Sequence, residues 1–249
     1  MDTNAKTHQQ WLQEMEAESR SKQTRFINGI SEKLRRPMVS EPPRHPYRGA
    51  PDFWNAYEWS EEERIENFTS NFKSAGGHVE RLATMDDAKR FITEKARSLS
   101  AKYVIRNKQP ELDALKLESE LPDARVSVWN EETTAGEGPL YWKARAAEAD
   151  IGIVMADYAA AYTGSITVRS SKDKGRSVSL LPTVLIAIIP LERLKTRLGE
   201  IMVHFDEGGR ENLPAGIHFI SGPSRSADIE NDLTIGVHGP GVVYALIVG

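Results

Sequence analysis

The spacing of apolar residues divides the chain into a polar, helical start and a region in which strands alternate with helices. Over residues 1–36 the apolar positions are sparse and form two clusters, one around Trp11 and one around Phe26, at helical spacing. This pattern predicts one or two amphipathic helices, which end before Pro37 because proline cannot continue a helix. Five prolines from Pro37 to Pro51 then predict an extended linker.

From residue 60 onward the pattern is that of an α/β domain. Ser60 and the three glutamates after it predict a helix start, and Gly76-Gly77 ends that helix. Apolar runs predict strands over 79–82, 103–105, 126–129, 149–154, 166–169, 184–189, 217–220 and 242–248. Because strands that alternate with helices pair in parallel, we predict a three-layer α/β/α domain with a mostly parallel mixed sheet, preceded by the N-terminal amphipathic helices.

Three segments follow from this pattern. They are an N-terminal helical appendage (1–36), a proline-rich linker (37–59) and the α/β domain (60–249). An amphipathic appendage must cover its apolar face, so it docks on its own domain, on a second copy or on a partner, and the first two are favoured. Within the domain, Pro190 predicts the start of a further helix over 191–205.

The composition of the chain excludes several kinds of functional site. The chain has 249 residues and no cysteine, which excludes a disulfide framework, a thiolate nucleophile, and any cysteine-bound zinc or iron–sulfur cluster in this chain. A net charge of −4 gives no basic face of the kind that binds nucleic acid. The start lacks a signal-peptide pattern, and the longest apolar run, residues 180–191, is too short to span a membrane. We therefore expect a cytoplasmic protein.

Residues 217–240 carry the densest set of turn residues in the chain. Ser221-Gly222-Pro223-Ser224 is predicted to join a strand to a helix, with free backbone N–H groups and hydroxyls at the helix start. That arrangement suits a phosphate or a carboxylate, and Arg225 and Arg176 would add positive charge. A capped turn without a ligand explains the same residues equally well.

His238 lies between two glycines in a second turn at a strand end, which makes it the best general acid/base candidate. Asp228 would orient its ring, although a histidine that only stabilises the loop is slightly favoured. We expect His204 and His218 to serve packing. The six histidines show no spacing typical of metal ligands, so we predict no metal site.

Two further hydroxyl-bearing stretches are predicted at the same edge of the sheet. Thr163-Gly164-Ser165 precedes a strand, and Ser177 and Ser179 belong to a loop before Leu180-Leu181-Pro182. Polar loops at strand ends of an open α/β sheet are where ligands bind. The candidate ligand-binding residues are Thr163, Gly164, Ser165, Arg176, Ser179, Ser221, Gly222, Ser224, Arg225 and Gly239.

These motifs together resemble one family. Thr163-Gly164-Ser165, GRSVSLLP at 175–182, SGPSRSADIE at 221–230 and GVHGP at 236–240 are similar, in this order and spacing, to the lactate utilisation protein C family, whose members consist of a LUD domain. The resemblance covers the chain from about Ser60 onward. It implies a fold like that of ribose-5-phosphate isomerase, glucosamine-phosphate deaminase and the CoA-transferases.

The resemblance also implies a function. Members of the family take part in oxidising L-lactate to pyruvate, together with two sibling proteins that carry the cysteine-rich and iron–sulfur motifs. A chain without cysteine fits the role of a subunit that carries no cluster. Many LUD domains have a glutamate before Thr-Gly-Thr, whereas this chain has Tyr162, and Ser165 in place of the last threonine. A carboxylate nucleophile of the CoA-transferase type is therefore not expected there.

Two other functions stay open from the residues alone. One is a free-standing enzyme that acts on a small phosphorylated or CoA-linked metabolite bound by the turns. The other is a non-catalytic assembly or regulatory subunit that binds its partners through the N-terminal helix. A homo-oligomer is compatible with all three functions, and the resemblance assigns no catalytic residue.

Overall fold

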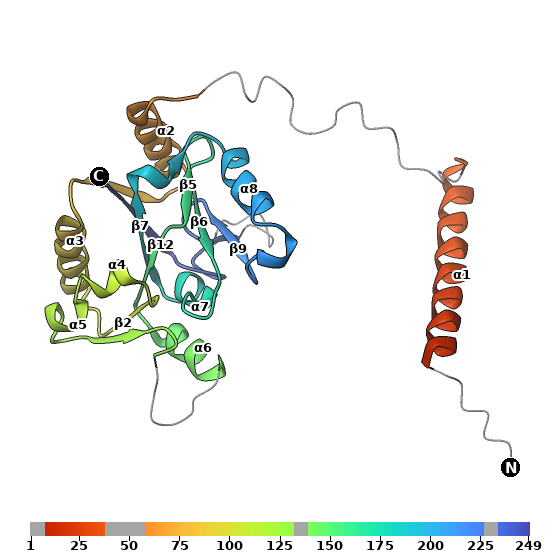
Figure 1. Ribbon diagram of the computed structural model, residues 1–249, viewed down its shortest axis with the longest axis horizontal. Coiled ribbons are helices and arrows are strands. Elements are labelled where there is room, and N and C mark those ends of the chain that lie inside the picture. Colours follow the sequence, from red (N-terminus) through yellow and green to blue (C-terminus); the bar gives the residue numbers. More distant parts are fainter. Residues whose placement is uncertain (1–7, 38–57, 132–138, 227–233) are drawn as a thin grey trace, which may run out of the picture. The chain divides into compact units, whose positions relative to one another are not determined.

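The computed structural model describes residues 8–37, 58–131, 139–226 and 234–249, and the chain separates into two compact units, Met1–Ala56 and Tyr57–Gly249. In the first unit, α1 is one continuous helix, His8–Leu34, and none of its residues is buried (Figure 1). The predicted amphipathic start is thus a single helix. The segment limits predicted at residues 36 and 59 stay predictions.

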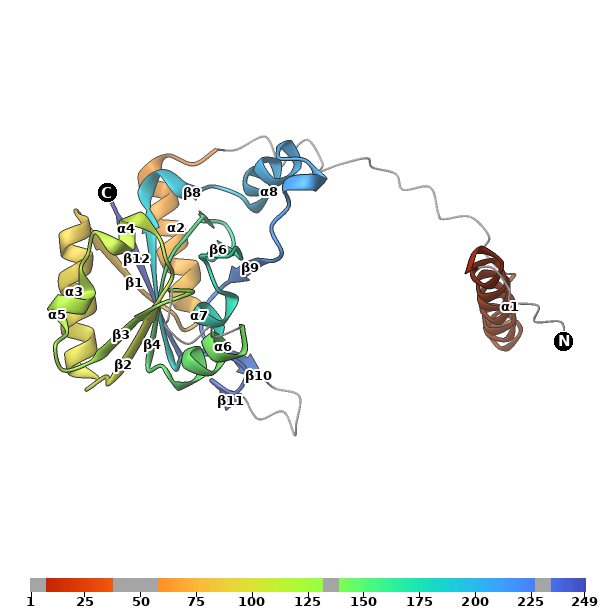
Figure 2. The ribbon, with the colours of Figure 1, turned by 60° about the horizontal axis from the view of Figure 1, so that its bottom comes forward.

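The second unit is built on a six-stranded sheet in which every pair of neighbours is parallel, in the order β1-β12-β7-β4-β2-β3 (Figures 1 and 2). Its strands are β1 (His78–Leu82), β2 (Tyr103–Arg106), β3 (Arg125–Val128), β4 (Ile151–Met155), β7 (Val184–Pro190) and β12 (Val242–Val248). Val184 aligns with Ile151 on one side and with Val242 on the other, so β7 lies in the centre of the sheet. The predicted α/β fold is confirmed.

Helices cover both faces of this sheet (Figure 2). One face carries α3 (Met85–Ser98), α4 (Pro110–Asp113) and α5 (Leu117–Glu120). The other carries α2 (Glu61–Ser74), α6 (Pro139–Glu148) and α7 (Arg176–Leu180). The start of α2 is as predicted, because the Ser60 hydroxyl accepts from the N–H of Glu63 and the Glu63 carboxylate accepts from the N–H of Ser60. The Ser60 N–H and the Ser60 hydroxyl both donate to the Glu63 carboxylate, and these two hydrogen bonds lower the pKa of Glu63.

A smaller mixed sheet packs beside α2 and α7. Its order is β8-β5-β6-β9, with β8 (Leu194–Lys195), β5 (Tyr158–Ala160), β6 (Ser165–Arg169) and β9 (Ile217–Ile220). The central strand β6 is antiparallel to both of its neighbours, β5 and β9. Strands β10 (Arg225–Ser226) and β11 (Thr234–Ile235) pair antiparallel to form a two-stranded ribbon. The mixed pairing therefore lies in a second sheet, apart from the parallel one.

Three local predictions were wrong. Residues 191–205 are not one helix: they form the 3₁₀ turn η2 (Leu191–Arg193), strand β8 and most of α8 (Leu198–Glu207), and a further turn η3 (Arg210–Asn212) follows. The reason is tertiary, since β8 pairs with β5 and the Thr196 carbonyl accepts from the Tyr162 N–H. The residues after Ser224 form β10 where a helix start was predicted, and the loop predicted around Ser179 is the helix α7.

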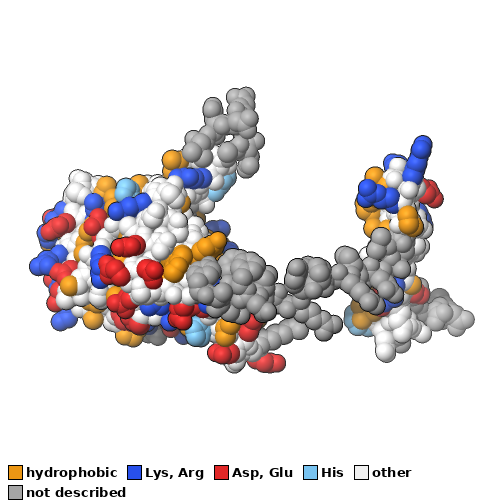
Figure 3. Space-filling view, turned by 90° about the horizontal axis from the view of Figure 1, so that it is seen from above, with side chains coloured by type: hydrophobic (Ala, Val, Ile, Leu, Met, Phe, Trp, Pro, Cys, Tyr) orange, Lys and Arg blue, Asp and Glu red, His pale blue; other side chains and the backbone are white. Residues whose placement is uncertain are grey.

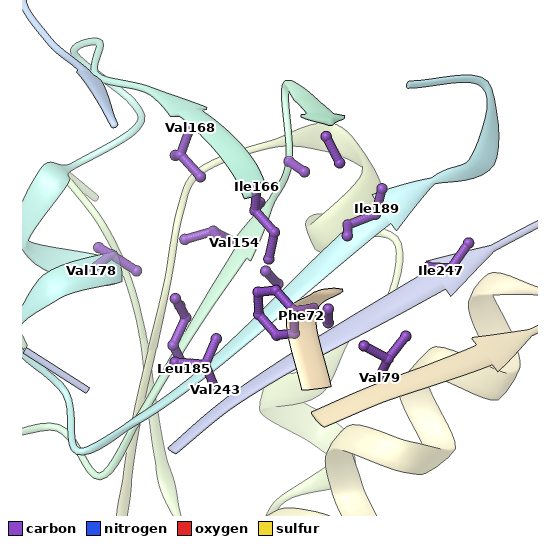
Figure 4. Packing of buried hydrophobic residues seen from close by; sticks show 14 of the residues in the cluster. Phe72, Val79, Val154, Ile166, Val168, Val178, Leu185, Ile189, Val243 and Ile247 are labelled. Atoms are coloured by element: carbon purple, nitrogen blue, oxygen red, sulfur yellow. The ribbon is translucent and has the colours of Figure 1, made fainter. Parts of the chain in front are cut away.

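The two faces of the main sheet bury separate cores. The core between the main sheet and the smaller sheet is shown in Figure 4, where residues from β4, β6, β7, β12 and α7 converge on Phe72. Phe72 is 0% exposed and also lies against Gly77, where an added Cβ would come within 2.2 Å of its ring. The other core packs α3, α4 and α5 against the opposite face.

Charged side chains of both signs are interspersed over the face of the domain that Figure 3 displays. Within the described ranges, no helix combines the length and the apolar composition needed to cross a bilayer. Among the described residues of the first unit, α1 carries large exposed apolar side chains, among them Phe26, which is 68% exposed.

We predict that Phe72→Ala lowers the free energy of unfolding by about 3–5 kcal/mol, because it removes a large ring from a closed core and leaves a cavity. Phe26→Ala is the matched control, since it makes the same change within a helix at an exposed position. Its effect should stay within about 0.5 kcal/mol. Urea denaturation of both variants measures the difference, and equal losses would show that the Phe72 core is not the stabilising unit.

Candidate functional site

The strand order of the main sheet reverses between β2 and β4. From β2 the chain continues to β3 on one side, and β4 then pairs on the other side of β2. The connections at this point leave the sheet in opposite directions, because α4 and α5 cover one face and α6 covers the other. Open α/β sheets bind ligands outside the carboxyl ends of the strands at such a reversal. Asn107 follows β2 there and Asp157 follows β4.

Residues 169–176, which we call the basic loop, are anchored at this reversal. The buried Asn107 accepts through Oδ1 from the N–H of Gly175 at 3.0 Å, and the N–H of Lys108 donates to the Asp173 carbonyl at 2.9 Å. The Nδ2 of Asn107 is buried and has no hydrogen-bond partner among the described residues. Gly175 lies so close to Trp129 that a Cβ would come within 2.2 Å of the ring. Only glycine fits at that position.

Asp157 connects the end of β4 to the basic loop. Its side chain is 6% exposed and accepts from Lys174 Nζ at 2.6 Å, from Arg169 Nε at 2.9 Å and from the Arg169 N–H at 2.7 Å. Three donors, two of them cationic, compensate for the cost of burying this carboxylate. The interaction fixes both cations next to the reversal point.

The opposite side of the basic loop contacts β9. Ser170 Oγ and His218 Nε2 are 3.0 Å apart and share a hydrogen bond, and the N–H of Ser170 donates to the Gly216 carbonyl. Burial lowers the pKa of His218, and the charge of Arg176 lowers that pKa further. His218 therefore does more than the packing role that we expected: it is a half-buried imidazole with a hydroxyl partner and a nearby guanidinium.

Two of the predicted stretches meet where β6 begins and β9 ends, at the opposite end of these strands from Ser170 and His218. Ser165 begins β6, Ser221 follows β9, and their hydroxyls are 2.7 Å apart. Gly164 adopts a φ of 57° and lies against the backbone of Phe72, where an added Cβ would come within 2.7 Å of the nitrogen. The glycine thus serves a close approach to the end of α2, and the exposed Thr163 extends beyond it.

The two turns of the stretch 217–240 are joined by their backbones. The N–H of Ser224 donates to the Pro240 carbonyl, and the N–H of Gly236 donates to the Ser224 carbonyl, both at 2.9 Å. Gly239 packs against the Ser224 side chain. The buried Ser179 hydroxyl is used within α7, because it donates to the Arg176 carbonyl at 3.0 Å.

The anion-binding turn at a helix start, predicted for residues 221–224, is not present. Arg225 belongs to β10, and its guanidinium lies against Gly76, just beyond the C-terminal end of α2. A cation is favourable at that end of a helix, which accounts for its position. Gly222 adopts a φ of 122° and packs on the Ala75 carbonyl, so it also serves this contact.

The predicted catalytic pair is not assembled by the described residues. His238 is exposed, and Asp228 lies outside the described residues. Among the ranges that the structure describes, no group of three or more His, Asp or Glu side chains is arranged to hold a metal ion. The predicted pairing of His238 with Asp228 stays a prediction.

A cavity of about 420 Å³ lies elsewhere, at the amino ends of β2 and β3. Its lining includes Arg97 in the last turn of α3, Ser100 after that helix, and Pro122 and Asp123 before β3. None of the predicted site residues lines it. Because ligands of open α/β sheets bind at the carboxyl ends of strands, we assign the candidate site to the reversal point and the adjoining basic loop.

Sequence reasoning missed Asn107, Asp157, Ser170 and Lys174. A signal for two of them was present, because Asn107 and Asp157 each come shortly after a run of apolar residues that was correctly assigned to a strand. The pairing of Asp157 with Lys174, and of Ser170 with His218, depends on how β6 and β9 fold back, which no local pattern reports.

Comparison with known proteins gives the family. The LUD domain model matches residues 65–248. This chain belongs to the LUD domain family and, within it, to the lactate utilization protein C proteins. The lactate utilization protein C of Halalkalibacterium halodurans is 37% identical over 218 residues, which cover 86% of this chain and 92% of that protein.

Two further matches agree with this assignment. The lactate utilization protein C of an Exiguobacterium species is 32% identical over 235 residues, covering 89% of this chain and 94% of that protein. The crystal structure of a DUF162 family protein from Deinococcus radiodurans matches 77% of this chain and 99% of its own, with a TM-score of 0.55 and 18% identity. At that identity the crystal structure supports the fold alone.

We predict that Asp157→Ala lowers the free energy of unfolding by about 2–4 kcal/mol, because it leaves the shielded Lys174 without its partner; the partial exposure of Arg169 limits the loss. Glu62→Ala is the control, since it breaks the exposed Glu62–Arg81 pair and should cost less than about 1 kcal/mol. Urea denaturation compares the two. A loss at Asp157 no larger than at Glu62 would mean that this carboxylate does not hold the basic loop.

Proposed function

We propose that this chain is a cytoplasmic component of an iron–sulfur system that oxidises L-lactate to pyruvate and so allows growth on lactate. The observation that carries the proposal is the match, over almost the full length of both chains, to proteins named for lactate utilization. The LUD domain match over residues 65–248 supports it.

The absence of cysteine bears on which proteins of such a system would hold the iron–sulfur clusters. This chain has no thiolate with which to hold an iron–sulfur cluster. The electron-carrying clusters would therefore belong to two partner proteins, and this chain would contribute its polar site at the reversal point. The site offers the exposed guanidinium of Arg176, a hydroxyl–imidazole pair and a buried amide, which suit the binding and orientation of an anionic substrate.

We predict that deleting the gene in its host abolishes or strongly slows growth on L-lactate as the sole carbon source. Growth on pyruvate should be unchanged, because pyruvate enters metabolism after the proposed oxidation step. A plasmid copy of the full chain should restore growth. Unimpaired growth of the deletion strain on L-lactate, in a host with no second copy, would contradict the proposal.

A second candidate function, assembly of the system, is favoured by α1. Seven large apolar side chains of this helix are exposed, and at 100° per residue all of them fall on one half of its circumference. They are Trp11, Leu12, Met15, Phe26, Ile27, Ile30 and Leu34. A helix with such a face gains stability by burying it against its own domain, a second copy or a partner, and assembly of the system would use the last of these. Assembly and substrate binding are compatible roles for one chain.

We predict that removing residues 1–50 abolishes co-purification with the iron–sulfur partner proteins. In the full chain, replacing Phe26 and Ile30 together with alanine should weaken co-purification, because both belong to the apolar face. Replacing Asn28 and Glu32 with alanine on the polar side is the matched control and should leave it unchanged. Full recovery of the partners with the truncated chain would show that α1 is not the docking element.

A further inference from the structure

Ser170 and His218 are hydrogen-bonded where the smaller sheet meets the basic loop, and Arg176, at the end of that loop, is near enough for its charge to act on the His218 imidazole. We propose that these three residues form a binding site for a small carboxylate anion, which we call the carboxylate site. The proposal rests on the proposed function, in which this site binds an anionic substrate, and it assigns a ligand class to named side chains of that site. It is carried by the charge, the geometry and the hydrogen bonding of the three residues.

Arg176 supplies the positive charge of the carboxylate site. The basic loop holds four cationic residues, and two of them, Arg169 and Lys174, are committed to Asp157. The exposed Arg176 forms no ion pair with a carboxylate in the described part of the chain. It is nevertheless close enough to His218 to depress the pKa of that imidazole. Its guanidinium therefore supplies a positive charge that the surrounding structure leaves uncompensated.

The geometry brings this charge to the hydroxyl–imidazole pair. Ser171 and Lys174 exchange two backbone hydrogen bonds, so the basic loop is a tight turn that returns Arg176 toward Ser170. On β9, His218 is hydrogen-bonded to Ser170 at 3.0 Å. A Cβ at Gly216 would come within 3.0 Å of His218 Nε2 and 3.3 Å of Ser170 Oγ. Glycine at that position keeps this side of the pair free of a neighbouring side chain.

A carboxylate is the anion that fits this combination best. A guanidinium presents parallel N–H donors that match the two oxygens of a carboxylate. A neutral imidazole adds no second charge, so the three residues offer one net positive charge to a monoanion. Whichever ring nitrogen carries the proton, the Ser170–His218 pair can donate to and accept from a further ligand oxygen. A small carboxylate with a hydroxyl or carbonyl oxygen beside the carboxylate would use all three residues.

Proton NMR of the His218 ring in the full-length protein tests the carboxylate site, with the resonance assigned by its loss in His218→Gln. L-lactate, pyruvate, acetate and inorganic phosphate are titrated separately at constant ionic strength, with chloride as the reference anion. We expect L-lactate and pyruvate to shift the His218 resonance saturably and to raise its pKa, because a bound anion stabilises the imidazolium. Acetate should bind more weakly, since it lacks the additional oxygen.

Three variants distinguish binding at the carboxylate site from a general attraction of anions to the positive charge of the protein. Arg176→Gln should weaken carboxylate binding about tenfold or more and, without ligand, should raise the pKa of His218 toward its ordinary value. Lys172→Gln removes the same charge from an exposed position in the same loop and should leave the affinity within about twofold, because exposed charges are screened. Ser170→Ala should weaken binding of L-lactate more than binding of acetate.

Three results would overturn the carboxylate site. They are the absence of a saturable shift with any carboxylate, a shift with phosphate alone, and equal weakening by Lys172→Gln and Arg176→Gln. Each of these results leaves the growth prediction untouched. Conversely, saturable binding together with normal growth of the deletion strain would reject the proposed function and retain the site.

Discussion

The buried carboxylate of Asp157 is the interaction on which the arrangement of the domain depends. It follows β4, a central strand of the parallel sheet, and binds the backbone and side chain of Arg169 at the end of β6, a strand of the smaller sheet. Lys174 of the basic loop donates to the same carboxylate. One side chain thus connects the two sheets and the loop at the reversal point. The ion pair contributes specificity of arrangement more than net stability, because desolvating the charges offsets much of their attraction.

The parallel sheet was predictable because its strands depend on local composition. The continuous apolar runs of β7 and β12 are what strands covered on both faces require, and both strands lie where the runs predict them. The start of α2 was equally local, because Ser60 and Glu63 satisfy its free backbone groups within one turn. The structure of these elements is determined by residues that are neighbours in the sequence.

The candidate site was only partly predictable because its members are joined by pairing between distant segments. Ser165 and Ser221 were both expected at one edge, and the β6–β9 register brings their hydroxyls together. At the other end of these two strands, Ser170 shares a hydrogen bond with His218, which we expected to serve packing. Arg225 was expected at an anion-binding turn, yet the ribbon formed by β10 and β11 directs it to the end of α2. Residue types indicated polar chemistry, but strand pairing decided which polar groups meet.

The position of β12 has a consequence for how the protein is made. In the part of the chain that the structure describes, β1, the first strand of the sheet, pairs with β12 alone, and β12, which follows the other strands of this sheet in chain order, also pairs with β7. During synthesis, β1 therefore has no neighbour in the sheet until β12 leaves the ribosome, and the edge of β7 stays open for as long. Contacts between such distant segments slow folding and expose unpaired edges to other chains. The sheet is consequently completed only when β12 inserts between two strands made earlier.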